Sequence, residues 1–193
     1  MFRATRVFHS LNRAAARNAS TLVVAEHSGN VINQGTLACV TAASKIGGEV
    51  SLLVMGANTA DVVADACNIP GITKVLFSNG ASLEHNLAEN TAKLVQGLSG
   101  DFTHILTPSS NVGKNFMPRL GAMMDSAPLS DVMEVVSEDT FVRPVYAGSA
   151  LATVQMKDSI KLITTRTTAF DKAATTGGSA SSSEVSSDGS DAG

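Results

Sequence analysis

Short apolar runs alternate with amphipathic stretches through the middle of the chain. The apolar runs lie at residues 21–25, 50–55, 74–77 and 102–106. Each is short enough for a strand and apolar enough to be buried on both faces, as the strands of a parallel sheet are. Between them, apolar residues recur at helical spacing from Leu87 to Leu98, and Thr59 followed by Asp61 is typical of a helix start. This order predicts a three-layer α/β fold with a mostly parallel, doubly wound sheet.

The pattern changes after Leu129. Four further runs, at residues 132–136, 140–146, 151–156 and 160–165, are predicted to be successive strands. Gly148 and Asp158 mark turns between them, so we expect an antiparallel extension that lies partly at the edge of the sheet. The acidic residues Glu138, Asp139 and Asp158 are interpreted as turn residues, because a general acid needs a cleft and a partner.

The first 20 residues contain four arginines and no acidic residue. The arginines are Arg3, Arg6, Arg13 and Arg17. On a helical wheel they share one side, and Val7, Phe8 and Leu11 cluster on the other. An arginine-rich, acid-free amphipathic helix is typical of a mitochondrial transit peptide, so we expect residues 1–20 to be one, cleaved between Arg17 and Ser20. The alternative is a solvated basic tail without a targeting function.

The other end of the chain has a different composition. Serine, glycine, alanine and threonine supply most positions from Ala173 to Gly193, and no aromatic residue occurs there. Such a segment has too little apolar surface to offset the entropy lost on ordering. We therefore expect residues 173–193 to form a flexible linker or tail, which leaves residues 21–172 as the packed domain.

The overall composition is that of a globular protein, since 44% of the 193 residues are hydrophobic and 16% are charged. The net charge is −3, but beyond the four N-terminal arginines 10 basic residues face 17 acidic ones, a net charge of −7. An acidic body disfavours nucleic-acid binding, and the lack of an apolar stretch of about 18 residues disfavours membrane insertion. Cys39 and Cys67 are too few for a disulfide framework or a zinc site, and we expect buried thiols.

Polar residues follow the predicted strand at 102–106 at its carboxyl end, where open α/β sheets place ligands. They are Ser109, Ser110, Asn111 and Lys114. A helix that begins here would attract an anion. The loop is not a Walker A motif, because Pro108 replaces the required earlier glycine and Asn115 follows the lysine. We keep these residues as candidates for an anion site, beside the plainer interpretation of a capped loop.

The histidines do not complete a catalytic or metal site. His27 lies in a second polar loop after the first strand, and His85 and His104 belong to other segments without metal-ligand spacing. His104 lies inside an apolar strand and is interpreted as a hydrogen-bonded structural residue. We therefore expect no catalytic residue and no metal ligand in this chain.

Specific motifs occur in the second half of the chain. They are DFTHILTPSSNVGKNFMPRL at 101–120, Ser130-Asp131, RPVYAGSALA at 143–152 and TTRTTAFD at 164–171. Together, over about residues 20–180, these stretches resemble the alpha subunit of the electron transfer flavoproteins. The resemblance implies an N-terminal α/β domain of the adenine-nucleotide hydrolase-like type and a C-terminal domain that holds FAD.

The same resemblance implies partners and a location. The alpha subunit of that family pairs with a beta subunit as a heterodimer in the mitochondrial matrix. The pair accepts electrons from acyl-CoA dehydrogenases and related dehydrogenases of fatty-acid β-oxidation and passes them to a membrane quinone oxidoreductase. This chain is accordingly expected to be part of an electron carrier and not an enzyme.

The chain departs from the family pattern at its end, because it stops in the predicted linker, before the FAD domain. The resemblance therefore implies a scaffold and subunit-interaction half, with no FAD ligand in this chain and no FAD bound by it alone. A truncated sequence and a split subunit are both open as explanations. The alternative function is a stand-alone adenine-nucleotide-binding module that uses the loops at His27 and Ser109.

Three residues of the 143–152 motif are candidates for the subunit contact. Arg143 offers a planar fork of donors, Pro144 fixes the backbone and removes a ladder donor, and Tyr146 adds an amphipathic ring. The alternative is that Tyr146 and Leu151 fill the core of the domain.

Overall fold

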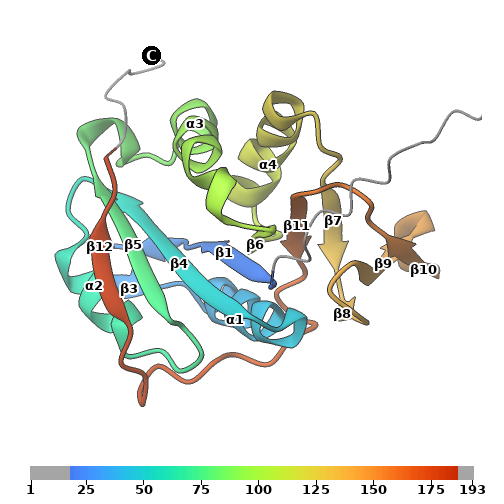
Figure 1. The fold of residues 1–193 in the computed structure, drawn as a ribbon, viewed down its shortest axis with the longest axis horizontal. Helices are drawn as coiled ribbons and strands as arrows, with labels where there is room; N and C mark the ends of the chain where they lie inside the picture. The colour runs from blue at the N-terminus through green and yellow to red at the C-terminus, as the bar shows by residue number, and fades with distance from the viewer. Residues whose placement is uncertain (1–17, 187–193) are drawn as a thin grey trace, which may run out of the picture.

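The computed structural model describes residues 18–186 and is built around a seven-stranded sheet in the order β12-β5-β4-β1-β6-β11-β7 (Figure 1). Its strands are β1 (Ser20–Val24), β4 (Glu49–Gly56), β5 (Lys74–Asn79), β6 (His104–Pro108), β7 (Leu129–Val132), β11 (Lys161–Thr165) and β12 (Ser181–Glu184). Every pairing in this sheet is parallel. The predicted parallel, doubly wound sheet is therefore confirmed, and each of the four apolar runs at 21–25, 50–55, 74–77 and 102–106 coincides largely with a strand.

Helices cover both faces of the sheet and complete the three layers (Figure 1). The helices α1 (Gln34–Ile46) and α2 (Ala60–Cys67) pack on one face, and α3 (Ala88–Leu98) and α4 (Asn111–Met124) on the other. Strand β1 is buried between the layers, with Val23 in the core of the first pair and Leu22 and Val24 in that of the second. Short 3₁₀ turns, η1 (Ala81–Leu83), η2 (Ser99–Asp101) and η3 (Tyr146–Gly148), connect the elements.

The start of α2 differs in one detail from the expected cap. Thr59 precedes the helix as predicted, but its side chain makes no capping hydrogen bond. Its hydroxyl instead donates to Oδ1 of Asn79 at 2.8 Å, which ties the helix to the end of β5. The same oxygen accepts a hydrogen bond of 3.1 Å from the backbone N–H of Thr59, so Asn79 fixes the residue before the helix.

An antiparallel extension is present, although it is smaller than predicted. Strands β8 (Glu134–Val135), β9 (Thr140–Val145) and β10 (Ala150–Gln155) form a three-stranded antiparallel sheet, called the arm below (residues 134–155). The run predicted at 160–165 is β11, which is not part of it and pairs in parallel with β6 and β7. Its residues Leu162 and Ile163 are buried on opposite faces, so an interior place in the main sheet suits this strand. A small hairpin, β2 (His27–Ser28) and β3 (Val31–Ile32), follows β1.

The prediction of a flexible tail is wrong for residues 181–184, which form β12 beside β5. Residues 173–186 are called the strap below. The segment has few apolar side chains, but an edge strand is held by backbone hydrogen bonds, which composition does not reveal.

The predicted transit peptide lies outside the described residues except for its last three positions, and Ser20 already belongs to β1. Within residues 18–186, no helix has the length and apolar character needed to cross a membrane.

Candidate functional site

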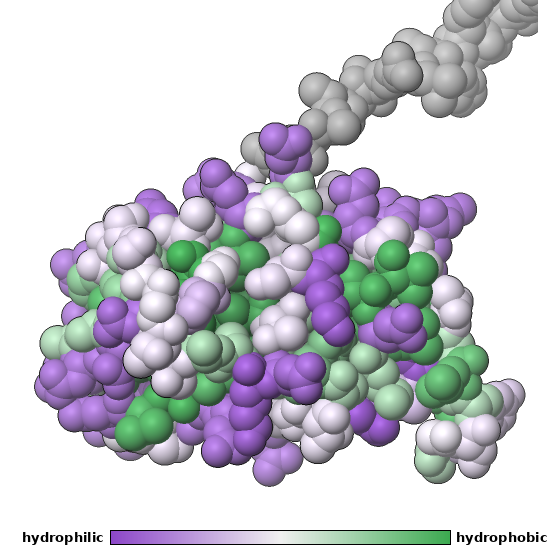
Figure 2. All heavy atoms as spheres, turned by 90° about the horizontal axis from the view of Figure 1, so that it is seen from below, coloured by the Kyte–Doolittle hydropathy of each residue, from purple (hydrophilic) through white to green (hydrophobic). Residues whose placement is uncertain are grey.

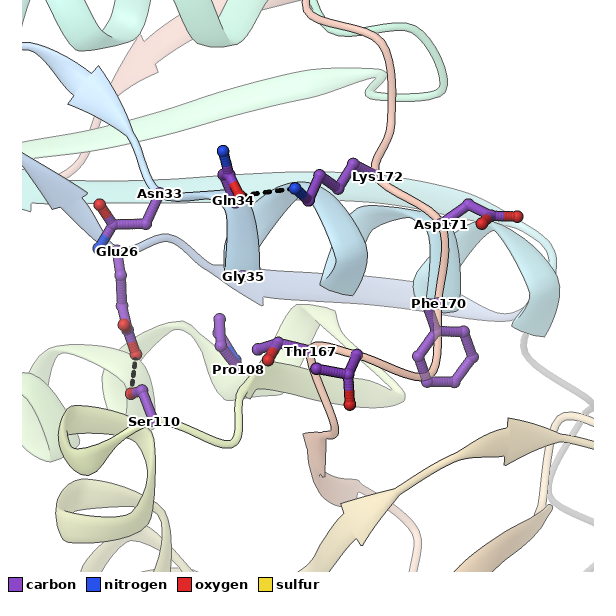
Figure 3. A pocket seen from close by; sticks show the side chains of 11 residues that line it. Glu26, Asn33, Gln34, Gly35, Pro108, Ser110, Thr167, Phe170, Asp171 and Lys172 are labelled. Carbon is purple, nitrogen blue, oxygen red and sulfur yellow. Dashed lines mark hydrogen bonds between the residues drawn. The ribbon is translucent and has the colours of Figure 1, made fainter.

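A pocket of about 720 Å³ opens at the carboxyl ends of β1 and β6 (Figure 3). These strands are neighbours in the sheet, yet the chain runs from β1 to β4 on one side and reaches β6 on the other, so the pocket lies at a topological switch point. Its lining consists of Glu26, Asn33, Gln34, Gly35, Pro108, Ser110, Thr167, Thr168, Phe170, Asp171 and Lys172. Open α/β sheets usually bind ligands at such a place.

The chain's own carboxylate occupies one end of this pocket. The hydroxyl of Ser110 donates to Oε1 of Glu26 and accepts a hydrogen bond of 3.0 Å from the backbone N–H of Gly113, so that Ser110 caps α4 (Figure 3). Burial raises the pKa of Glu26, while hydrogen bonds from Ser110 and the Gly113 N–H lower it in part. The backbone N–H of Glu26 also donates to the Thr36 hydroxyl at 2.9 Å, which links the starts of α4 and α1.

The structure does not bring the residues proposed for an anion site together. Ser110 caps α4 and lines the pocket, while Asn111 and Lys114 point to solvent from the first turn. The backbone N–H of Ser109 donates to the carbonyl of Thr165 at 2.8 Å. The geometry favours the capped loop, because the Glu26 carboxylate already fills the place that an anion would take.

This pocket does not fit the pyrophosphate of FAD or of an adenine nucleotide. A phosphate group at the start of α4 would meet the carboxylate of Glu26, and Lys172, the basic residue of the lining, donates to Oε1 of Gln34 at 2.6 Å (Figure 3). Sequence reasoning missed Glu26, although it directly follows the first predicted strand and so lies at the same edge as Ser110.

His27 and His104 are hydrogen-bonded to backbone carbonyls. The ring nitrogens of His27 lie 2.9 Å from the carbonyl oxygen of Gly29 and 2.8 Å from that of Met55, which fixes the β2–β3 hairpin to β4. Nε2 of His104 lies 2.6 Å from the carbonyl oxygen of Glu138. The structural interpretation of His104 is confirmed, and His27 is not part of the strand-end pocket.

Asp139 and Cys39 are also held by the fold in structural positions. Asp139 accepts hydrogen bonds from Thr140, Gln155 and Ser137, which lower its pKa to about 2, as expected of a turn residue. Burial raises the pKa of the Cys39 thiol to about 12, so this thiol is a core group. Across residues 18–186, no group of histidine, cysteine and acidic side chains is arranged to hold a metal ion.

The arm separates the candidate interface residues onto two faces. In the β9–β10 register Arg143 lies opposite Ala152, and Pro144 lies opposite Leu151. Alternation places Arg143 on the same face as Phe141, which is fully buried, whereas Pro144 and Leu151 share the outer face. Accordingly Nη2 of Arg143 donates to the Ser130 hydroxyl of β7 at 3.0 Å.

The tip and outer face of the arm are exposed. Tyr146, in the η3 turn, is 85% exposed, and Leu151 is 64% exposed, so the alternative that both fill the core is wrong. Figure 2 shows the arm as a projecting lobe with apolar patches on its surface. Tyr146 and Ala147 both have positive φ angles, of 51° and 54°, a backbone conformation that such residues adopt at a cost.

The motif at 164–171 holds the end of β7 and the residue after it, next to the arm. Nη2 of Arg166 lies 2.6 Å from Oδ2 of Asp131, and its Nη1 donates to Sδ of Met133 at 3.6 Å. Asp131 has a φ of 61°, at the point where the β7–β11 register shifts. The ion pair thus fixes an irregular strand next to the first residues of the arm.

The fold and these sites define a doubly wound α/β domain with a strand-end pocket, occupied at one end by Glu26, and an exposed antiparallel arm. The model of the electron transfer flavoprotein domain matches residues 21–189, and the chain belongs to this family.

Several relatives are named electron transfer flavoprotein subunit alpha. The Pseudomonas aeruginosa protein is 46% identical over 165 residues, which cover 86% of this chain and 53% of the relative. The mitochondrial protein of Dictyostelium discoideum is 40% identical over 186 residues, which cover 91% of this chain and 52% of the relative. The probable mitochondrial protein of Caenorhabditis elegans is 42% identical over 161 residues, which cover 82% of this chain and 48% of the relative. The chain spans about half the length of these curated relatives.

Proposed function

We propose that the chain is the amino-terminal part of an electron transfer flavoprotein alpha subunit and acts as its scaffold and subunit-interaction half. The observation that carries this proposal is the family match over residues 21–189, together with 40–46% identity to three proteins named as alpha subunits. In the complete protein, electrons would pass from acyl-CoA dehydrogenases to a membrane quinone oxidoreductase. The role of this part is assembly within an electron carrier, not catalysis.

FAD is proposed as the cofactor of the complete protein. The strand-end pocket is not expected to bind it, because Glu26 fills the start of α4 and Lys172 is hydrogen-bonded to Gln34. The same two observations argue against the alternative of a stand-alone adenine-nucleotide-binding module. Neither ATP nor AMP at millimolar concentration is expected to raise the melting temperature of the 193-residue chain.

The subunit contact is proposed to use the outer face of the arm. Pro144 and Leu151 lie on that face, and Tyr146 extends it at the tip. Exposed aromatic and aliphatic side chains next to each other are typical of the centre of an interface. Arg143 is proposed to position the arm through Ser130 and to support the contact from the inner face.

The mitochondrial matrix is proposed as the location. Two of the relatives are named as mitochondrial, and the first 20 residues have the pattern of a transit peptide. Fused to a fluorescent passenger, residues 1–20 should direct it to mitochondria. Replacement of Arg3, Arg6, Arg13 and Arg17 by Glu should leave the passenger in the cytosol, and a cytosolic passenger with the unchanged peptide would contradict the proposal.

Co-expression with a tagged beta subunit of the family tests the assembly role. The chain should elute with the tagged subunit in a 1:1 complex on size exclusion. An unrelated α/β domain expressed with the same partner serves as the control. Separate elution of the two chains at micromolar concentration would refute the proposed role.

A further inference from the structure

The strap crosses the whole domain before it joins the sheet. From the end of β11 the chain passes along the side of α1 and α2 and reaches the far edge, where β12 lies beside β5 (Figure 1). Four backbone N–H groups outside the β12–β5 ladder hold it. Ala173 donates to the carbonyl of Leu37, Gly178 to Asn68, Ala180 to Cys67 and Val185 to Phe77, at 2.7–3.2 Å.

Two glycines fit the strap to the end of α2. Gly177 has a φ of 105°, a conformation that favours glycine. A Cβ atom on Gly178 would lie 2.4 Å from the carbonyl oxygen of Ile69 and 2.6 Å from its carbonyl carbon. Because both contacts are with backbone, no side-chain rotation relieves them. The strap therefore docks at a defined place through close backbone approach.

Few apolar contacts add to these hydrogen bonds. None of residues 173–186 is fully buried, and Ser181, Ser182 and Glu184 of β12 are exposed. Only Ala173, Ala180 and Val185 of the strap pack partly against the two cores. Segments with few buried apolar contacts and exposed backbone hydrogen bonds open at lower free energy than the rest of a domain.

The sheet does not depend on the strap for its interior. Strand β5 pairs with β4 over the register from Ser51–Lys74 to Gly56–Asn79, and its residues Val75 and Leu76 are buried. These pairs do not involve β12, which covers the outer edge of β5. The free energy needed to open the strap can therefore differ from that needed to unfold the domain core.

We propose that residues 173–186 are a releasable strap that opens as one unit while the rest of the sheet stays folded. With the strap docked, the chain leaves the domain beside β5 and α3. With it released, the point of departure moves back to the start of α1, and the freed residues add at most about 46–50 Å of extended chain. The strap thus acts as a tether of two lengths for any segment that follows residue 186. This last step rests on the proposed function, since the alpha subunits that the chain matches are about twice as long.

Hydrogen exchange of the full 193-residue chain, followed by mass spectrometry, tests the release directly. The amides of Gly178, Ala180 and Val185 should exchange at least tenfold faster than those of β4. Low concentrations of urea should accelerate β4 exchange much more than strap exchange, because local opening exposes little surface. Equal rates with equal urea dependence would show that the strap opens only on global unfolding and would overturn the proposal.

The variant Gly178→Ala tests whether the docking contact controls opening. It should accelerate exchange in residues 173–186 by a further tenfold or more, and in β1 and β4 by no larger a factor, because raising the free energy of the docked state brings it closer to every open state. Gly97→Ala is the matched control, because nothing lies within 4 Å of the added Cβ, and it should accelerate exchange in neither region. Ile105→Val, in the core of β6, should instead accelerate exchange in β4 and leave residues 173–186 unchanged, and equal acceleration of both regions in this variant would contradict a separable strap. The exchange measurement needs no beta subunit, so its failure is distinct from a failure of assembly.

Discussion

Nε2 of His104 lies 2.6 Å from the carbonyl oxygen of Glu138, a residue 34 positions further along the chain. A carbonyl oxygen only accepts, so Nε2 carries the proton. On the other side of the ring, the hydroxyl of Thr103 lies 2.8 Å from Nδ1. His104 belongs to β6 and is only 2% exposed, so the contact ties the middle of the sheet to the turn before β9.

This environment predicts a loss of stability in mild acid. Burial lowers the pKa of His104 in the folded state, and the nearby charge of Lys161 acts in the same direction, against the carbonyl of Glu138. The unfolded chain, with a histidine pKa near 6.5, then binds the proton more readily. The stability that neutral His104 contributes is fully present above the pKa of the unfolded chain. It is lost as the pH falls through the lower pKa of the folded protein.

Chemical unfolding at a series of pH values between about 7.5 and 5 measures the effect. The free energy of unfolding should fall with pH in the unchanged chain, and the fall should be smaller in His104→Gln. Burial raises the pKa of Glu26, so that group acts in the opposite direction, but it is common to both proteins. Identical pH dependences of the two would contradict the assignment.

The side chain of Glu26 is predicted to stabilise the start of α4. Glu26→Ala removes the acceptor of the Ser110 hydroxyl and should lower the free energy of unfolding by about 1–3 kcal/mol. Glu26→Gln keeps an acceptor oxygen and should cost less than half as much. The control Glu49→Ala changes an exposed carboxylate at the opposite end of the sheet and should stay within about 0.5 kcal/mol. Equal losses in the Ala and Gln variants, measured by urea unfolding, would refute the acceptor role.

The four strands β1, β4, β5 and β6 were predictable because they carry nearly continuous apolar runs, as strands buried between two layers do. The position of β11 was not, since an apolar run such as Leu162–Ile163 reveals a strand but not its neighbour. The strap left no signal, because Ser181–Glu184 pairs through backbone groups that every residue has. The hydrogen bond between Ser110 and Glu26 at one end of the pocket was not predictable, because the two residues are 84 positions apart and meet only in the complete fold.

The two faces of the arm, by contrast, could have been separated from the sequence. In a strand with a period of two, Phe141, Arg143 and Val145 share one face, and Pro144 lies on the other. Treating Arg143, Pro144 and Tyr146 as one surface ignored this alternation. The structure also places Arg143 against Ser130, so its side chain holds the arm from the inner face.

Arg143→Ala is therefore expected to have two effects. Association with a beta subunit should weaken by about 1–3 kcal/mol, the usual range for losing a charged hydrogen-bonding group. The melting temperature of the chain alone should also fall, because the hydrogen bond to the Ser130 hydroxyl is lost. Calorimetric titration and thermal unfolding measure the two effects, and a large fall in melting temperature with unchanged affinity would restrict Arg143 to a structural role.

Leu151 gives the sharper test of the outer face, since it is 64% exposed and contributes little to the fold. Leu151→Asp places a charge where the proposed contact would exclude water, so affinity for the beta subunit should fall at least tenfold, or about 1.4 kcal/mol. The melting temperature of the isolated chain should stay within about 2 °C, because a substitution at an exposed position usually changes stability by less than about 0.5 kcal/mol. Val31→Asp is the matched control: Val31 is 68% exposed but lies on the β2–β3 hairpin, so the same charge there should leave affinity unchanged. Equal losses of affinity in both variants would point to a nonspecific effect of charge, and no loss in Leu151→Asp would exclude the outer face of the arm as the contact.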